Sequence, residues 1–121
     1  MGGRIMADAA ILIGWNEPKS GREAQAAALF GESIQYYTTL VKDGTIESFE
    51  PVLLLRHGGD FNGFILVRGE GGKLDALQRA DKFVDLTIRA THCLSGFGVI
   101  QGWVGEGLQR IMSQWMAAMP K

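Results

Sequence analysis

The first strand of the chain is predicted at residues 9–15, where the sequence reads AAILIGW and every position is apolar or glycine. A half-exposed strand carries polar side chains at every second position. An unbroken apolar run instead indicates a strand with both faces buried, which belongs in the middle of a sheet. The segment at residues 61–68, FNGFILVR, also places apolar side chains on both faces, and we predict a second central strand there.

The segments around these two strands complete an α+β pattern. Residues 45–55 are predicted as a strand, and Pro51 within it lacks the N–H of a ladder, which indicates a sheet edge or a bulge. The glycine-rich turn at residues 56–60 joins it to the next strand as a hairpin. A last strand is predicted at residues 95–104, and helices at about 20–42, 74–90 and 106–119. The predicted order is β-α-β-β-α-β with a C-terminal helix.

The first helix is predicted to begin with a capping box, in which Ser20 is the cap and Glu23 lies three positions on. It ends at Asp43-Gly44, because glycine suits the turn after a last helical residue. Its apolar and small residues recur at three-and-four spacing, which predicts one buried face. The residues of that face are Ala24, Ala27, Ala28, Gly31, Ile34, Tyr37, Thr38 and Val41. The second helix is predicted to be kinked near Asp81.

Composition indicates one globular domain at residues 9–119, preceded by a flexible segment at residues 1–8. The chain has 121 residues, of which 46% are hydrophobic and 21% charged. Its net charge of −1 and the lack of a charged block predict no nucleic-acid partner. The sequence contains no run of about 18 apolar residues, so no membrane span is predicted. A single cysteine, Cys93, fits a reducing compartment, so a cytoplasmic location is expected.

The apolar central strands also predict a partner. Helices on one side of a four-stranded sheet leave the other side open to water. Each large apolar side chain left there forfeits roughly 1.5 to 3 kcal/mol. We therefore expect a homodimer in which two sheets face each other. The alternative is a monomer whose C-terminal helix folds back over its own open sheet.

The C-terminal helix needs a surface to lie against, because it carries one apolar stripe. The residues of the stripe are Leu108, Ile111, Met112, Trp115, Met116 and Met119. The polar side of this helix lacks the lysines that favour a membrane surface, so packing within the dimer is expected.

Three stretches resemble a known family. They are residues 36–46, with Tyr36-Tyr37, Leu40 and Asp43-Gly44-Thr45-Ile46; residues 58–67, with Gly58-Gly59-Asp60-Phe61; and residues 74–83, with Leu74-Asp75-Ala76-Leu77 and Asp81-Lys82-Phe83. In their spacing they resemble the YCII-related branch of the dimeric α/β-barrel superfamily. The resemblance implies a ferredoxin-like protomer with strand order 4-1-3-2. Other members of the superfamily are cofactor-free monooxygenases or haem-binding enzymes.

The resemblance also points to two acidic residues. YCII-like proteins carry a histidine on the first helix and an aspartate that opens the second part of the later helix. Asp81 matches that aspartate, whereas Lys82 replaces the proline that follows it. The first helix of this chain has no histidine, and Glu32 lies roughly where one is looked for.

Two histidines are candidates for chemistry. His57 lies in the turn at residues 56–60 and can act as a general base with Asp60 as its orienting group, although the simpler explanation is a solvated turn, in which glycines and an aspartate are expected. His92 lies beside Cys93 near a helix end, from which it can ligate a haem iron or activate the thiol. The helix dipole alone also explains a histidine at that place. No cofactor is expected, and the spacing of these residues predicts no metal site.

Further candidates belong to a binding cavity. Trp15 and Asn16, at the exit of the first strand, can line a cavity mouth or close the core as a lid. Arg68 paired with a carboxylate is the preferred polar pair on an otherwise apolar element. Two functions therefore stay open. One is an enzyme that acts on a small apolar or aromatic molecule by histidine and carboxylate acid–base chemistry, and the other is a non-catalytic ligand-binding or structural dimeric module.

Overall fold

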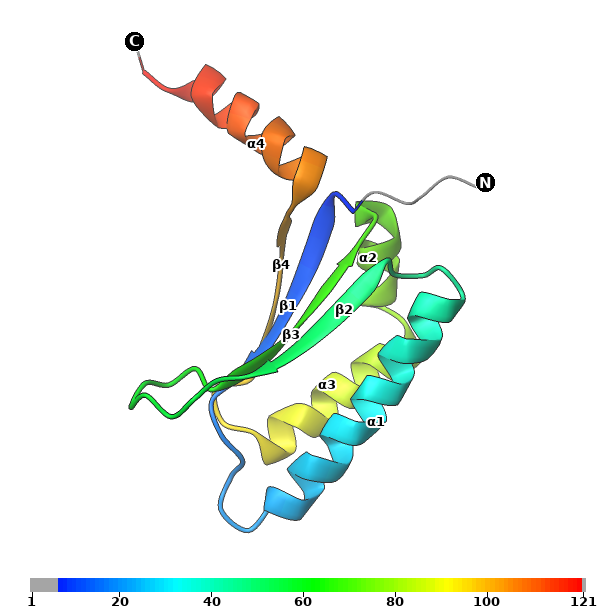
Figure 1. Ribbon diagram of the computed structural model, residues 1–121, viewed down its shortest axis with the longest axis vertical. Helices are drawn as coiled ribbons and strands as arrows, with labels where there is room; N and C mark the ends of the chain where they lie inside the picture. The colour runs from blue at the N-terminus through cyan, green and yellow to red at the C-terminus, as the bar shows by residue number, and fades with distance from the viewer. Residues whose placement is uncertain (1–6, 121) are drawn as a thin grey trace.

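A computed structural model describes residues 7–120 and shows a two-layer α+β fold (Figure 1). The elements follow one another as β1 (Ala9–Trp15), α1 (Glu23–Lys42), β2 (Ser48–Leu53), β3 (Gly63–Gly69), α2 (Gly71–Leu77), α3 (Asp81–Cys93), β4 (Gly98–Trp103) and α4 (Gly105–Ala118). The predicted β-α-β-β-α-β order and the C-terminal helix are confirmed. None of the helices among the described residues is long and apolar enough to cross a membrane.

The four strands form one antiparallel sheet in the order β2-β3-β1-β4, which confirms the predicted order 4-1-3-2. Leu12 in the middle of β1 pairs with Leu66 of β3 on one side and with Ile100 of β4 on the other. The two strands that are apolar on both faces are therefore the central ones. Pro51 lies in β2, an edge strand, where its missing N–H interrupts no inner ladder.

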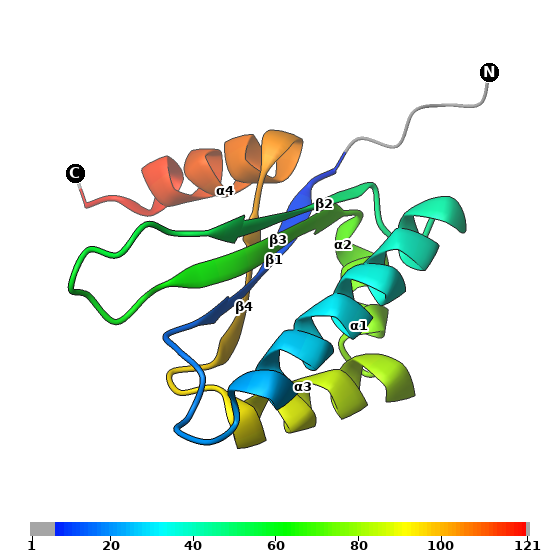
Figure 2. The same cartoon turned by 60° about the horizontal axis from the view of Figure 1, so that its bottom comes forward.

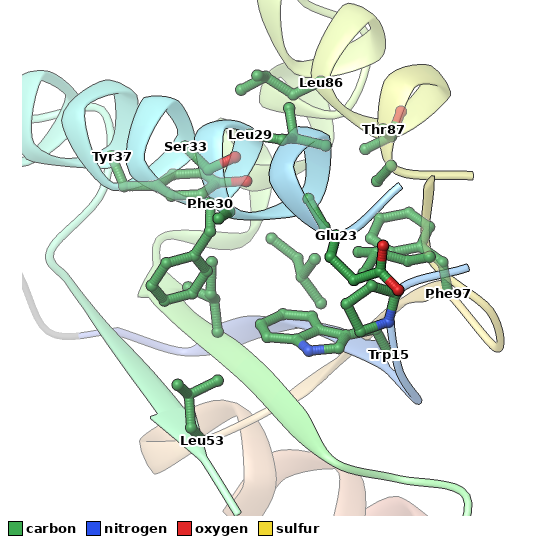
Figure 3. A pocket seen from close by; sticks show the side chains of 17 residues that line it. Trp15, Glu23, Leu29, Phe30, Ser33, Tyr37, Leu53, Leu86, Thr87 and Phe97 are labelled. Atoms are coloured by element: carbon green, nitrogen blue, oxygen red, sulfur yellow. The ribbon is translucent and has the colours of Figure 1, made fainter. Parts of the chain in front are cut away.

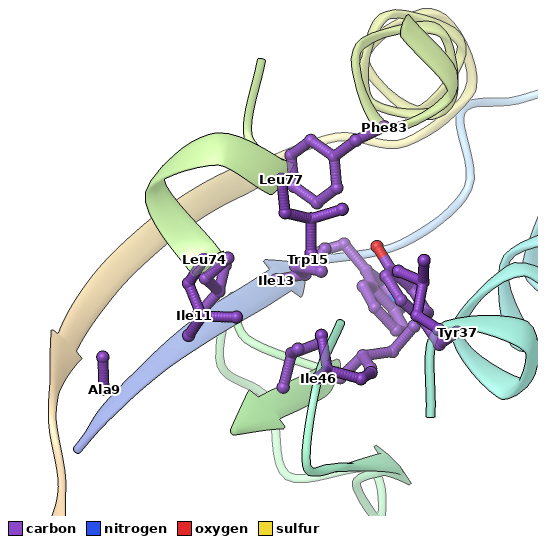
Figure 4. Close-up of a cluster of buried hydrophobic side chains, with 12 residues drawn as sticks. Ala9, Ile11, Ile13, Trp15, Tyr37, Ile46, Leu74, Leu77 and Phe83 are labelled. Carbon is purple, nitrogen blue, oxygen red and sulfur yellow. The ribbon is translucent and has the colours of Figure 1, made fainter. Parts of the chain in front are cut away.

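The helices cover one face of the sheet and enclose the core there. Odd-numbered residues of β1 and β3, such as Ile11 and Val67, point to this face and are fully buried. Figure 4 shows Leu74 and Leu77 of α2 and Phe83 of α3 packed on them, with Tyr37 of α1 at the side. A second cluster, made of Ala26, Leu29, Leu86, Ala90 and Cys93, joins α1 to α3.

None of the described helices packs across the opposite face of the sheet (Figure 2). Its central side chains follow from the register: Leu12 of β1 lies between Leu66 of β3 and Ile100 of β4. Ile100 is 64% exposed. Phe64 lies on the same face, and its ring stacks on Phe61 at 5.7 Å. We call this surface the open face; its apolar character is the one expected from the sequence.

Helix α1 differs from the prediction at its start and in its buried face. It begins at Glu23 after Arg22, and no side chain caps it, so the predicted capping box at Ser20 is wrong. Its buried residues are Ala26, Leu29, Tyr37 and Leu40. Ala24, Ala27, Ala28, Gly31, Thr38 and Val41 are exposed. The helix turns its leucines inward because burying a leucine removes far more apolar area from water than burying an alanine.

The predicted second helix is two helices. Helix α2 ends at Leu77, and α3 begins at Asp81, where we expected a kink. The backbone of Ala80 is extended, with φ −68° and ψ 140°, so the chain turns there and both short helices can place apolar side chains on the curved sheet.

Helix α4 leaves the end of β4 and stands away from the sheet, on the side opposite α1 and α3 (Figures 1 and 2). The alternative in which this helix folds back over its own open face is therefore not the arrangement seen. Its base is held by the N-terminal segment, since Val104 donates a hydrogen bond to the carbonyl of Asp8, 3.2 Å away. The backbone N–H of Asp8 bonds to Gly69, so the ordered domain begins before Ala9. The rest of the predicted flexible segment, residues 1–6, lies outside the described residues.

Gly107 allows this close contact, because a Cβ atom there would lie only 2.0 Å from the carbonyl oxygen of Asp8. We expect Gly107→Ala to displace the base of α4 and to lower the free energy of unfolding by about 1 to 3 kcal/mol, as overpacking does. Gly72→Ala is the matched control, since it has open space around it within α2 and should be neutral or stabilising. Urea unfolding measures both. Equal stabilities of the two variants would contradict the proposed contact.

Candidate functional site

A cavity of about 370 Å³ lies between the covered face of the sheet and helices α1 and α3. Figure 3 shows its floor, formed by Trp15, and its walls, which include Leu29 from α1 and Leu86 from α3. Most of its lining side chains are apolar. The complete lining is Ile13, Trp15, Pro18, Glu23, Ala26, Ala27, Leu29, Phe30, Ser33, Tyr37, Leu53, Ile65, Leu86, Thr87, Ala90, Leu94 and Phe97.

Trp15 lies flat on the sheet as the floor of the cavity. It is 8% exposed, and Phe30 of α1 meets it edge-on at a centroid distance of 6.0 Å. The indole fits because the neighbouring strand has Gly63 beneath it, where a Cβ atom would lie 2.7 Å from the ring. Of the residues that the sequence placed in a binding cavity, Trp15 is the one that lines it.

Tyr37 supplies a polar group to this apolar cavity. The residue is only 3% exposed, and its ring packs on Phe49 at 5.8 Å. Burial raises the pKa of the phenol well above its usual value, so the hydroxyl keeps its proton. Ser33 lies one turn earlier on the same face of α1, and Figure 3 shows the oxygens of both residues on the cavity side.

The proposed pair of His57 and Asp60 lies in the β2–β3 hairpin, outside the cavity lining. Both residues are exposed. The Nε2 atom of His57 lies 2.8 Å from the carbonyl oxygen of Phe61, and its Nδ1 accepts a bond from the N–H of Gly59 at 3.2 Å. Both ring nitrogens therefore contact backbone groups of the same loop and stabilise its conformation. Among the side-chain bonds of residues 7–120, none joins His57 to Asp60.

His92 is exposed on α3, whereas its neighbour Cys93 is buried. The two side chains thus point in different directions, as adjacent residues of a helix do. His92 lines a hollow of about 250 Å³ with Arg22 and Arg89. Within the described part of the chain, no group of three or more histidine, cysteine or acidic residues could hold a metal ion.

Glu32 belongs to an ionic cluster that links α1 to α3. Its carboxylate accepts two hydrogen bonds from Arg89, at 2.7 and 3.0 Å, and another from Lys82. Arg89 also binds Asp85 at 3.0 Å. The hydrogen bonds from Arg89 first, and then those from Lys82, lower the pKa of Glu32 to about 2. Glu32 therefore forms an ion pair with Lys82, the residue that follows Asp81. Asp81 itself is exposed at the start of α3.

The remaining predicted polar residues lie at the open face and at the end of β1. Arg68 and Glu50 form an ion pair of 3.7 Å, and the register places both on the open face. The predicted partner for Arg68 thus exists, but outside the cavity. Asn16 accepts a hydrogen bond from the side chain of Asn62, which ties the end of β1 to the hairpin loop.

Sequence reasoning missed most of the cavity wall, including Leu29, Phe30, Ser33 and Leu86. The signal was present on α1, where positions 26, 29, 30, 33, 37 and 40 follow a helical spacing. The alanine-rich face of the same helix has a similar spacing, so the spacing alone does not distinguish the two faces. Nothing in the sequence alone shows that these side chains leave a space between them.

The ionic cluster predicts an acid-dependent loss of stability. Because the pKa of Glu32 falls from 4.5 to about 2 on folding, its contribution is complete above pH 4.5 and disappears as the pH falls towards 2. We expect Glu32→Gln to flatten this part of the stability profile, as measured by urea unfolding at a series of pH values. Glu47→Gln, which replaces an exposed carboxylate, should keep the wild-type profile. An unchanged profile in Glu32→Gln would refute the role of the cluster.

Comparisons with known proteins show which fold the chain has. No protein-family model matches the chain, and no curated protein is similar to it in sequence. A dimeric protein of unknown function with a ferredoxin-like fold, from Bacteroides fragilis, gives a TM-score of 0.61 at 7% identity, over 84% of this chain and 100% of its own. A conserved protein from Methanosarcina mazei gives 0.58 at 17% identity, over 79% of this chain and 92% of its own.

A protein of unknown function from Nitrosomonas europaea gives a TM-score of 0.57 at 15% identity, over 84% of this chain and 92% of its own. Identities this low show the fold alone. The chain therefore has a ferredoxin-like α+β fold, and the likeness to the YCII-related branch stays a prediction.

Proposed function

We propose that the protein binds a small, largely apolar molecule, such as an aromatic compound, in the cavity between its sheet and its helices. The observation that carries this proposal is the cavity itself. Its volume of about 370 Å³ falls within the roughly 300 to 1,000 Å³ typical of ligand pockets. Aromatic and aliphatic side chains form most of its surface, and such surfaces bind apolar ligands by removing both partners from water.

The arrangement supports a binding module better than the acid–base enzyme. His57, Asp60 and His92, on which that enzyme depends, are absent from the cavity lining. A general base must reach the proton that it removes, directly or through one water. The carboxylate in the lining is that of Glu23, which is exposed at the start of α1. The proposal includes no haem or other cofactor.

The proposal also includes a homodimer formed through the open face. At the centre of this face Leu12, Phe64 and Leu66 are half-buried, and Ile100 is 64% exposed. Removing each of these side chains from water contributes up to roughly 1.5 to 3 kcal/mol, which a second copy can supply. The same surface fits the expectation drawn from the apolar central strands.

Helix α4 adds to this interface in the proposal. Its apolar side chains are exposed, among them Trp115 at 66% and Met116 at 64%. From Ile111 to Met119 the helix carries no charged residue. The helix stands on the same side of the sheet as the open face, so a second copy can cover both surfaces at once (Figure 2). Two-fold symmetry would then bury each chain's helix and sheet in the same way.

Filling the cavity tests the binding function. Ala27 lines the cavity and is exposed on α1, so Ala27→Trp should block the space with little cost to folding. We expect the affinity for naphthalene, followed by its fluorescence, to fall by at least about tenfold, equivalent to 1.4 kcal/mol. Ala24→Trp is the control, because Ala24 is equally exposed on the same helix and lies outside the lining. Equal affinities of the two variants would place the ligand elsewhere.

A charge on the open face tests the dimer. Ile100 and Ile88 are 64% and 53% exposed, but Ile100 lies on the open face and Ile88 on α3. We expect Ile100→Glu to raise the dissociation constant of the dimer by about 100-fold, since both copies lose apolar burial. Ile88→Glu should leave the dimer intact. Sedimentation equilibrium measures both, and a wild-type monomer at all concentrations would disprove the proposal.

A further inference from the structure

The hydroxyl of Tyr37 is the unusual polar group of the cavity. The residue is only 3% exposed, and none of the side-chain hydrogen bonds of residues 7–120 involves its oxygen. No side-chain oxygen sealed from solvent lacks a partner in this part of the chain, so the hydroxyl is accessible from the cavity that Tyr37 lines. The ring packs between Tyr36 and Phe49, at 5.5 and 5.8 Å, which holds the hydroxyl at the cavity wall. Its natural partner is therefore something inside the cavity.

Ser33, which is half-buried, is a second hydroxyl residue of the cavity lining. The two residues are four positions apart on α1, so their side chains lie on one face of the helix. The hydroxyl of Ser33 also lacks a hydrogen bond to residues 7–120, whereas that of Thr87, a further lining residue, is bound to the carbonyl of Val84. Two hydroxyl donors thus meet in one part of an apolar wall. A carbonyl oxygen has two lone pairs and can accept from both.

The charges around the cavity exclude an anionic ligand group. The described lining contains no lysine, arginine or histidine, and its charged residue is Glu23. Glu23 and Tyr37 are fourteen positions apart on α1, which separates their backbones by about 21 Å. A carboxylate bound near Tyr37 would lose its hydration without meeting a cation, which is costly. Because the phenol keeps its proton, Tyr37 acts there as a neutral donor.

We propose that the cavity selects neutral, flat apolar molecules with one hydrogen-bond-accepting group, such as an aryl ketone, and that Tyr37 and Ser33 bind that group. This inference rests on the proposed ligand-binding function and specifies the class of ligand. The apolar walls hold the ring system, and the two hydroxyls set its orientation.

The test compares three ligands of similar shape: acetylnaphthalene, ethylnaphthalene and naphthoate, all substituted at the same ring position. Isothermal titration calorimetry with the full chain should show acetylnaphthalene binding roughly 2- to 12-fold more tightly than ethylnaphthalene, as one neutral hydrogen bond provides. Naphthoate should bind most weakly. In Tyr37→Phe the ratio of the affinities for the ketone and for ethylnaphthalene should fall, because one of the two donors is removed. Ser33→Ala should reduce the preference in part.

Tyr36→Phe is the matched control, because Tyr36 adjoins Tyr37 on α1 and lies outside the cavity lining. It should keep the preference. Tyr37→Phe removes a hydroxyl that makes no hydrogen bond to residues 7–120, so the variant should fold, and its thermal unfolding verifies this. If ethylnaphthalene binds but the ketone has no advantage, or if naphthoate binds as tightly, the inference is wrong while the binding function stands. If none of the three binds, both are wrong.

Discussion

The structure depends on the fact that a chain of this topology can cover only one face of its sheet. The connections from β1 to β2 and from β3 to β4 each join parallel strands, and right-handed crossovers place α1 and α3 on the same side. The central strands are nevertheless apolar on both faces. One face is therefore used within the chain, for a core and a cavity, and the other remains for contacts outside it.

The sequence predicts those aspects of the fold that depend on strand patterns. The unbroken apolar run at residues 9–15 identifies a central strand, and Pro51 identifies an edge. It fails on α1, because two sets of positions there have helical spacing. Only the tertiary contacts decide between an alanine-rich face and one that contains Leu29 and Leu40, since they determine which side chains can fill the space above the sheet.

The site is harder to predict, because it depends on which side chains converge and on what they leave empty. His57 and Asp60 are chemically suitable and adjacent in sequence, but their loop uses the histidine to hold its own backbone. Glu32 lies on α1 roughly where the resemblance suggests a histidine, and it forms ion pairs with Lys82 and Arg89 of α3. The spacing of these residues in the sequence does not predict that they meet. Tyr37 was predicted to be buried. That its hydroxyl lines a cavity and makes no hydrogen bond to residues 7–120 follows only from the three-dimensional packing of its neighbours.

Gly63 controls the height of the cavity floor, because it lies beneath the indole of Trp15. The residue does not line the cavity, yet the indole that forms the floor can lie flat only because position 63 has no side chain. A larger residue there would lift the floor and leave every lining residue unchanged. During evolution, the size of the accommodated molecule can thus be altered from behind the pocket wall, independently of the groups that recognise its polar end.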